Sequence, residues 1–316
     1  MGGRLATEVI QSRSDLTQLD DGDFWALYIS YEGAVVATSF RTVEEAPFPT
    51  IQWRGIPGAW QSTHSQDRYC SYVEEIRAAI AAGEVYQVNA CRVMSTSYSG
   101  TLDGLFSKIL EKNPAPYASY LRTDGIEIAS ASPELFLKRS GSTLLTSPIK
   151  GTRSLDSEPF GNKDGSENIM IVDLMRNDLG AISTEVTTPH LLREERHPGL
   201  FHLVSDVQGE LKPGLTWSEI LQPLLPAGSI SGAPKSSARR IISEHEAARG
   251  PYCGILGWVQ GDQALLSVAI RIFWRDGYEV KFGTGAGITW DSDPLGEWRE
   301  TELKAERLIS IARGSL

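Results

Sequence analysis

The sequence predicts an α+β protein, because its strand and helix signals are mixed and do not follow the regular strand–helix–strand order of an α/β fold. The clearest strand signals lie near the C-terminus, where residues 254–260, 264–274 and 278–283 are apolar runs typical of a meander. Gly261-Asp262 and Asp276-Gly277 supply the turns, and the second pair suits a two-residue hairpin. Amphipathic helices lie on both sides of this group in the sequence. We therefore expect sheets built from hairpins and covered by helices.

The N-terminal third contains a strand, an irregular region, a helix and a second strand. Residues 24–30 (FWALYIS) are an apolar run that predicts a strand, and Pro and Gly residues mark 47–58 as irregular. Residues 66–82 have the apolar spacing of a helix, and 85–96 again predict a strand. The apolar face of this helix consists of Val73, Ile76 and Ile80, and Gly83 ends it.

Two further helices carry most of the acidic residues discussed below. One is predicted over residues 163–179. The other begins at Asp293-Pro294, with Asp as the N-terminal cap and Pro in the first turn, and extends to residue 312.

Composition limits the classes of partner. The chain has 316 residues, 41% of them hydrophobic, and a formal net charge of −10 without any run of five Lys or Arg residues. This argues against nucleic acid and acidic membranes as partners, while a small anion could still bind to a local cationic cluster. The cysteines are Cys70, Cys91 and Cys253; their odd number and wide spacing argue against a disulfide framework or a zinc site. We expect a soluble, cytoplasmic protein, because neither a secretory leader nor an apolar run of membrane-spanning length is present.

Two pairs of carboxylates have the spacing of neighbours on one helix face. Asp164 and Glu167 are three residues apart, and so are Glu297 and Glu300. Hard oxygen ligands from two helices suit Mg²⁺ better than zinc. A solvated helix face is the alternative for either pair taken alone. Lys304, four residues after Glu300, could pair with a ligand carboxylate or with Glu300 itself.

Glycine-rich segments and a buried cation suggest an anion site. Residues 226–235 (PAGSISGAPK) precede an amphipathic helix whose N-terminal N–H groups could bind an anion, although a plain turn is the alternative and the GK[ST] arrangement of a nucleotide loop is absent. Gly285 and Gly287 permit close approach of the backbone to a ligand, or a bulge. Arg271 lies in an apolar strand and needs a partner, which is either a salt bridge or an anionic ligand.

Two other side chains are candidates for acid–base or nucleophilic chemistry. Lys150 lies at the end of an apolar strand, after Ser132-Pro133-Glu134 in the sequence, where desolvation could make its amine nucleophilic, although an ordinary surface lysine is the alternative. His202 could be a general acid or base or a core histidine.

Nine motifs follow one another along the chain. They are SPELF (132–136), PIKGTR (148–153), KDGSENIMIVDLMRNDLG (163–180), HLVSDVQG (202–209), PAGSISGAPK (226–235), YCG (252–254), AIR (269–271), GTGAGI (283–288) and DSDPLGEWRETELKA (291–305). Taken together and in this order, they resemble the chorismate-binding family, which includes the anthranilate, aminodeoxychorismate, isochorismate and salicylate synthases. The likeness covers roughly residues 65–312.

The resemblance implies a fold and a domain organisation. The fold is two large packed, mainly antiparallel sheets flanked by helices, with the active site between the sheets. Residues 1–60 are expected to be an N-terminal segment, shorter than in many relatives, that joins the sheets. Residues 61–316 are the expected catalytic domain, and the two parts form one structural unit.

The resemblance also implies roles for the candidate residues. Glu167 and Glu300 would hold Mg²⁺ directly, and Asp164 and Glu297 would reach it through water. The metal and Lys304 would bind the ring carboxylate of chorismate. The enolpyruvyl carboxylate would be bound by Arg271, Tyr252, the hydroxyl of Ser231 and the backbone N–H groups of Gly285 and Gly287.

Lys150 decides between branches of the family. Anthranilate synthases typically carry alanine at this place, whereas aminodeoxychorismate synthases carry lysine. The implied reaction is amination of chorismate at carbon 4: Lys150 attacks ring carbon 2, the 4-hydroxyl leaves with a proton from Glu134 near His202, and ammonia then displaces the lysine. Isochorismate and salicylate synthases use a lysine on the strand after the first helix, and our alignment of QVNACRV (87–93) places Arg92 or its neighbour there.

The ammonia source and the competing functions complete the expectation. No cysteine lies in a Gly-x-Cys-x-Gly motif, so the resemblance implies a separate glutaminase subunit or the use of free ammonia. The alternatives are an anthranilate synthase component, an isochorismate or salicylate synthase, and a catalytically inactive chorismate sensor.

Overall fold

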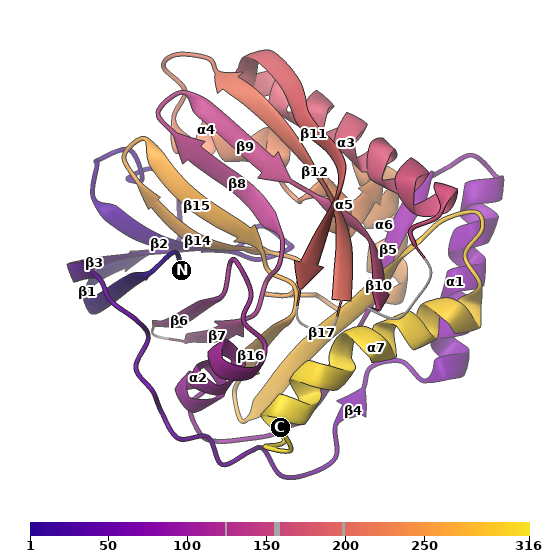
Figure 1. Ribbon diagram of the computed structural model, residues 1–316, viewed down its shortest axis with the longest axis horizontal. Helices are drawn as coiled ribbons and strands as arrows, with labels where there is room; N and C mark the ends of the chain where they lie inside the picture. The colour runs from indigo at the N-terminus through magenta and orange to yellow at the C-terminus, as the bar shows by residue number, and fades with distance from the viewer. Residues whose placement is uncertain (124, 155–158, 198–199) are drawn as a thin grey trace.

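The computed structural model describes residues 1–123, 125–154, 159–197 and 200–316, and it contains two antiparallel sheets (Figure 1). The larger sheet has ten strands, and β11 (Ser183–His197) pairs with β12 beside the main path. Its path runs through β1 (Arg4–Arg13), β3 (Val35–Glu45), β2 (Phe24–Ile29), β14 (Ile255–Gln260), β15 (Gln263–Val268), β8 (Leu135–Ser140), β9 (Thr143–Ser147), β12 (Leu200–Leu211) and β10 (Ile149–Ser154).

The smaller sheet has seven strands, and its longest pairing is between β5 and β17. Its path runs through β13 (Gly232–Ala233), β5 (Gln87–Ser97), β17 (Glu279–Ile288), β16 (Ile272–Asp276), β7 (Ile126–Ser130) and β6 (Ser119–Thr123), with β4 (Gln61–Ser62) paired to β5. The α+β sandwich implied by the resemblance is therefore confirmed.

Helices cover the sheets. α1 (Gln66–Ala81), α2 (Asp103–Lys112) and α7 (Pro294–Ala312) pack on the seven-stranded sheet, and α3 (Asn162–Ile182) packs on β10, β11 and β12 of the other (Figure 1). The shorter elements are α4 (Trp217–Leu221), the 3₁₀ turn Gln222–Leu224, α5 (Gly228–Ser231) and α6 (Lys235–His245).

The cap residues explain where two of these helices begin. The hydroxyl of Ser65 accepts a hydrogen bond from the backbone N–H of Arg68 at the start of α1. Asp293 accepts one from the backbone N–H of Gly296 at 2.7 Å, and Pro294 occupies the first turn of α7. The predicted helix starts are confirmed at both places.

The predicted C-terminal meander is wrong in one respect. The expected strand 264–274 is two strands, because the chain leaves β15 at Val268, turns through residues 269–271 and enters β16 at Ile272. β15 belongs to the ten-stranded sheet and β16 to the seven-stranded one, so this segment passes between the layers. Arg271 has φ +53°, a left-handed conformation that ends the strand. The hairpin β16–β17 also turns at Gly277-Tyr278, one residue later than predicted.

The N-terminal residues contribute to both layers. β1, β2 and β3 extend the ten-stranded sheet. The segment that follows packs on an apolar core between the seven-stranded sheet, α2 and α7, through Phe48, Trp53 and Trp60. The three cysteines are free thiols. None of the helices in the described ranges has the length and apolar character needed to cross a membrane.

Candidate active site

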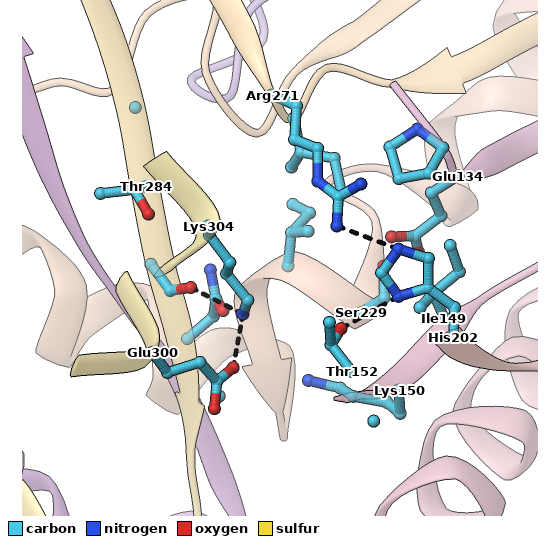
Figure 2. Close-up of a pocket in the computed structure, with 18 of the residues that line it drawn as sticks. Glu134, Ile149, Lys150, Thr152, His202, Ser229, Arg271, Thr284, Glu300 and Lys304 are labelled. Atoms are coloured by element: carbon cyan, nitrogen blue, oxygen red, sulfur yellow. Dashed lines mark hydrogen bonds and ion pairs between the residues drawn. The ribbon is translucent and has the colours of Figure 1, made fainter. Parts of the chain in front are cut away.

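A cavity of about 180 Å³ is lined by residues of both sheets and of α3 and α7. Every site residue predicted from the sequence except Ser231 lines it. Figure 2 shows Lys304 and Glu300 on one side and Arg271, His202 and Glu134 on the other.

Lys150 is directed into the cavity by an irregularity in β10. The pairing of β10 with β12 shifts register between Ile149 and Thr152, and Gly151 has φ +82°. Lys150 is buried, and its amine end extends toward Glu300 in Figure 2. Burial lowers the pKa of Lys150, an effect that the charge of Glu167 partly opposes. The fold thus favours a neutral amine.

Gly287 leaves the space that this amine occupies. A Cβ atom added to Gly287 would lie 2.7 Å from Lys150 Nζ and 2.8 Å from Gln87 Nε2. Gly287 faces the cavity from β17, two residues beyond Gly285 and four beyond Gly283, where a Cβ atom would run into the Tyr252 ring. The GTGAGI motif therefore provides room for side chains that other elements bring in.

Glu134 is a buried carboxyl on the side of the cavity away from Lys304 and Glu300 (Figure 2). It follows Ser132-Pro133, just before β8, and 3% of its surface is exposed. Burial raises the pKa of Glu134 to about 7, although a hydrogen bond with Ser229 and the positive charge of Lys150 act in the other direction. A carboxyl with this pKa can donate a proton near neutral pH.

Arg271 and His202 form the same side of the cavity. His202 Nε2 lies 2.9 Å from an Nη atom of Arg271, and His202 Nδ1 lies 3.0 Å from the hydroxyl of Thr152 (Figure 2). Arg271 is half-buried, and its partial removal from water lowers the pKa of its guanidinium to about 10. It remains a cation at neutral pH and suits a ligand carboxylate.

The four predicted metal carboxylates reach the cavity from two helices. Asp164 and Glu167 come from α3, and Glu297 and Glu300 from α7. Glu167 accepts a hydrogen bond from Thr289 at 3.2 Å, and Glu297 accepts one from Ser292 at 2.6 Å. Within the described ranges, no three acidic, His or Cys residues are close enough to form a closed cluster.

Lys304 lies on the same side as these carboxylates. Its amine is 2.6 Å from Glu300 Oε1 and 3.0 Å from the Gly285 carbonyl. It thus links α7 to β17 at the edge of the cavity. As a cation beside hard oxygen ligands, it can accompany a metal in binding one carboxylate.

The loop 226–235 places its polar groups differently from the prediction. Ser231 is fully buried and donates its hydroxyl hydrogen bond to the Ala227 carbonyl at 2.9 Å, whereas Ser229 and Ile230 line the cavity. Lys235 pairs with Asp178 of α3 at 2.6 Å. Residues two apart in a helical turn point to different sides, so Ser229 faces the cavity and Ser231 does not.

The strand after the first helix does not present Arg92 to the cavity. Arg92 donates to Thr301 and Ser62 and pairs with Glu302. Asn89 lines the cavity, and the buried amide of Gln87 approaches Lys150 beside Gly287. Both Gln87 amide atoms lack a hydrogen-bond partner among the described residues. Sequence reasoning missed Gln87 because only the register of β5 with β17 shows which side chains face the site.

Comparisons with known proteins show that the chain is similar to chorismate-binding enzymes. Residues 28–310 match the family model described as chorismate binding enzyme. The aminodeoxychorismate synthase component 1 of Bacillus subtilis (strain 168) is 36% identical over 263 residues, 78% of this chain and 56% of the relative. The anthranilate synthase component 1 1 of Haloarcula marismortui is 33% identical over 290 residues, 87% of this chain and 58% of the relative. The chain thus spans little more than half the length of these two relatives.

Solved structures agree in fold. The anthranilate synthase component I of Streptococcus pneumoniae TIGR4 has a TM-score of 0.83 at 22% identity, covering 97% of this chain and 91% of that chain. The menaquinone-specific isochorismate synthase MenF of Escherichia coli has a TM-score of 0.80 at 19% identity, covering 98% and 85%. With the family model covering most of the sequence, the chain belongs to the chorismate binding enzyme family.

Proposed function

We propose that this chain aminates chorismate at carbon 4 to give 4-amino-4-deoxychorismate, using ammonia from a glutaminase partner. The observation that carries the proposal is the buried amine of Lys150, which enters a cavity that also contains a carboxyl with a raised pKa. A nucleophile must be neutral and a general acid must be protonated. Burial favours both states at once in Lys150 and Glu134.

The reaction balances on these two groups. The Lys150 amine forms a bond to ring carbon 2, both ring double bonds shift, and the carbon 4 hydroxyl leaves as water with the Glu134 proton. Ammonia then bonds to carbon 4, both double bonds shift back, the lysine leaves as a neutral amine, and the proton released by the new amine returns to Glu134. The net reaction is chorismate plus ammonia to the aminated product plus water.

The two ends of the cavity match the two carboxylates of the substrate. Arg271 would bind the enolpyruvyl carboxylate, with Tyr252 beside it. The backbone N–H groups of Gly285 and Gly287 would bind the same carboxylate. Lys304 would contact the ring carboxylate. His202 lies next to Arg271, on the side where Glu134 protonates the leaving hydroxyl. Ser231 acts only through the loop, since its hydroxyl is used within α5.

The acidic residues fit Mg²⁺ by their chemistry. They present hard carboxylate oxygens from two helices to one cavity, beside a cation that can share a ligand carboxylate. Glu167 and Glu300 would hold the ion directly, with Asp164 and Glu297 behind water. When bound, Mg²⁺ would offset the negative charge of the substrate carboxylate.

Two sibling reactions are the competing proposals. Isochorismate formation requires a general base that activates water. The residue of β5 near Lys150 is Gln87, and its amide cannot act as such a base. Anthranilate formation remains the alternative because an anthranilate synthase component is among the relatives of similar identity. The presence of Lys150 favours amination at carbon 4 over the formation of anthranilate.

The test is to identify the product. The chain is incubated with chorismate, ammonium and Mg²⁺ at alkaline pH, and the product is characterised by mass and by the NMR position of the new amine. The carbon 2 and carbon 4 amines have equal mass, so NMR decides between them. Omitting Mg²⁺ or adding EDTA should stop turnover. Anthranilate, isochorismate or unchanged chorismate as the outcome would refute the proposal.

The Lys150→Ala variant tests the nucleophile. We expect at least about a hundredfold loss of amination, since the covalent route is removed, with chorismate binding retained through Arg271 and Lys304. In the wild type without ammonia, intact-protein mass spectrometry should show a Lys150 adduct. Amination of carbon 4 by the variant at the wild-type rate would contradict the lysine mechanism.

A further inference from the structure

The contacts of His202 define the positions of its protons. Arginine has no acceptor, so the Arg271 Nη atom must donate across the 2.9 Å contact to His202 Nε2. Nε2 therefore carries a lone pair, and the ring proton is on Nδ1, where the Thr152 hydroxyl lies 3.0 Å away and accepts it. Two protons on this ring would direct an N–H against a guanidinium. The ring is neutral in this arrangement.

The backbone holds this ring in place. Thr152 and His202 are directly paired residues on β10 and β12, so the hydroxyl and the imidazole meet across the ladder. His202 has 1% of its surface exposed. Thr152 follows Lys150 by two residues, so one bulged strand supplies both the nucleophile and the partner that orients His202.

Arg271 depends on this contact. It lies where the chain crosses between the sheets, with φ +53°, and it is half-buried. The contact with His202 is the one hydrogen bond that its guanidinium makes to another side chain or carbonyl in the described ranges. A guanidinium has five N–H donors, so those not used in this contact are left for a ligand carboxylate.

We propose that His202 is a positioning residue: a neutral, Nδ1-protonated imidazole that accepts from Arg271 and orients it toward the substrate carboxylate. In this role it transfers no proton to or from the substrate. The proposal rests on the proposed function for the identity of the ligand, whereas the proton arrangement belongs to the free protein and is testable without substrate.

The first experiment reads the proton positions directly. The protein is labelled with ¹⁵N-histidine, and two-bond ¹H–¹⁵N spectra are recorded at neutral pH. The chain has five histidines, and the His202 signals are those absent from His202→Gln. We expect a pyrrole-like Nδ1 and a pyridine-like Nε2. An Nε2–H tautomer, or two pyrrole-like nitrogens, would overturn the proposal.

The second experiment separates positioning from proton transfer with two near-isosteric variants. The glutamine amide oxygen reaches the place of Nε2 and can accept from Arg271, whereas the asparagine amide reaches only the place of Nδ1. In a Lys150→Ala background, which excludes covalent chemistry, we expect His202→Asn to raise the chorismate Kd about tenfold and His202→Gln to raise it less than about threefold. With Lys150 present, kcat should fall little in His202→Gln.

An acid–base role predicts the opposite pattern. Glutamine cannot transfer the proton, so both variants would then lose kcat equally while Kd stayed unchanged. That result would overturn the positioning role. In an Arg271→Ala background, the Asn substitution should add no further loss, and an undiminished loss there would also refute it. If wild-type protein does not bind chorismate, the proposed function fails, but the NMR experiment still decides the proton arrangement.

Discussion

At the scale of single residues, folding shifts the titration of the Glu134 carboxyl into the neutral pH range. Its folded pKa of about 7 lies above the ordinary value of 4.5. Between these two values the folded state holds a proton that the unfolded state releases, so stability is lost as pH rises from about 4.5 to 7.

The Glu134→Gln variant tests this shift without reference to activity. Glutamine keeps the shape and has no charge to bury. Its advantage over wild type in free energy of unfolding should be near zero at pH 4.5 and reach roughly 2–3 kcal/mol at pH 8. Urea unfolding at several pH values measures it. A difference that does not change with pH would show that the carboxyl titrates normally.

Gly287 gives a sharper test of the lysine position. Its backbone lies outside the left-handed region, so alanine is tolerated conformationally, but the new methyl group would lie 2.7 Å from Lys150 Nζ. The flexible amine must move, so we expect Gly287→Ala to fold normally and to lose amination about tenfold or more, as small misplacements of reacting groups cost at least this much. The matched control is Gly180→Ala on α3, where a Cβ atom meets nothing within 4 Å. Equal activity in both variants would mean that the amine does not use this space.

At the scale of elements, the sequence predicts best where local signals decide. The cap at Asp293 locates a helix start because its side chain satisfies a free N–H group three residues away. The crossing at residues 269–271 was missed because the apolar run continues through it, and only tertiary structure assigns β15 and β16 to different sheets. Arg271 is the local sign of this crossing, a charge with positive φ inside an apolar run.

One buried ion pair connects the elements around the site. Arg249 makes two hydrogen bonds to Glu246, at 2.7 and 2.8 Å, and also donates to the carbonyls of Ile230 and Asn89. Ile230 and Asn89 both line the cavity, so this pair fixes α5 against β5 from behind the site.

The Arg249→Lys variant should therefore weaken the fold. Lysine keeps the positive charge but lacks the branched guanidinium that makes these hydrogen bonds together. We therefore expect the free energy of unfolding to fall by about 2–3 kcal/mol. The control is Arg240→Lys, because Arg240 makes its ion pairs to Glu84 and Glu244 at the surface; that change should leave the free energy of unfolding nearly unchanged. Denaturant unfolding of both variants measures the difference, and equal losses would show that burial of the Arg249 pair contributes nothing.

At the scale of the whole molecule, the site is built from segments that are distant in sequence. Nearly all the site residues predicted from the motifs line the cavity, because each motif carries its own signal. It could not distinguish Ser229 from Ser231, or Gln87 from Arg92, since those choices depend on helix phase and strand register. Functional roles within the cavity follow from contacts such as that between His202 and Arg271, which no single motif contains.

Whether the chain can release ammonia from glutamine by itself depends on all three of its cysteines. Hydrolysis of glutamine requires a reactive thiolate, and burial raises the pKa of Cys91 far above its ordinary value and raises that of Cys70 as well. Cys253 is buried. We therefore expect the isolated chain to aminate chorismate with ammonium at alkaline pH, where free ammonia is present, and to show less than about 1% of that rate with glutamine.

If a glutaminase partner supplies the ammonia, as proposed, adding it should give glutamine-dependent turnover at neutral pH, because ammonia is then released in the complex and not drawn from protonated ammonium in solution. The matched control is the same mixture with the catalytic cysteine of the glutaminase changed to alanine, which should support turnover with ammonium but not with glutamine. Product formation with both nitrogen sources is followed over time. Glutamine use by the pure chain, undiminished by changing Cys70, Cys91 or Cys253 to alanine, would show that it contains a second active site of a different kind.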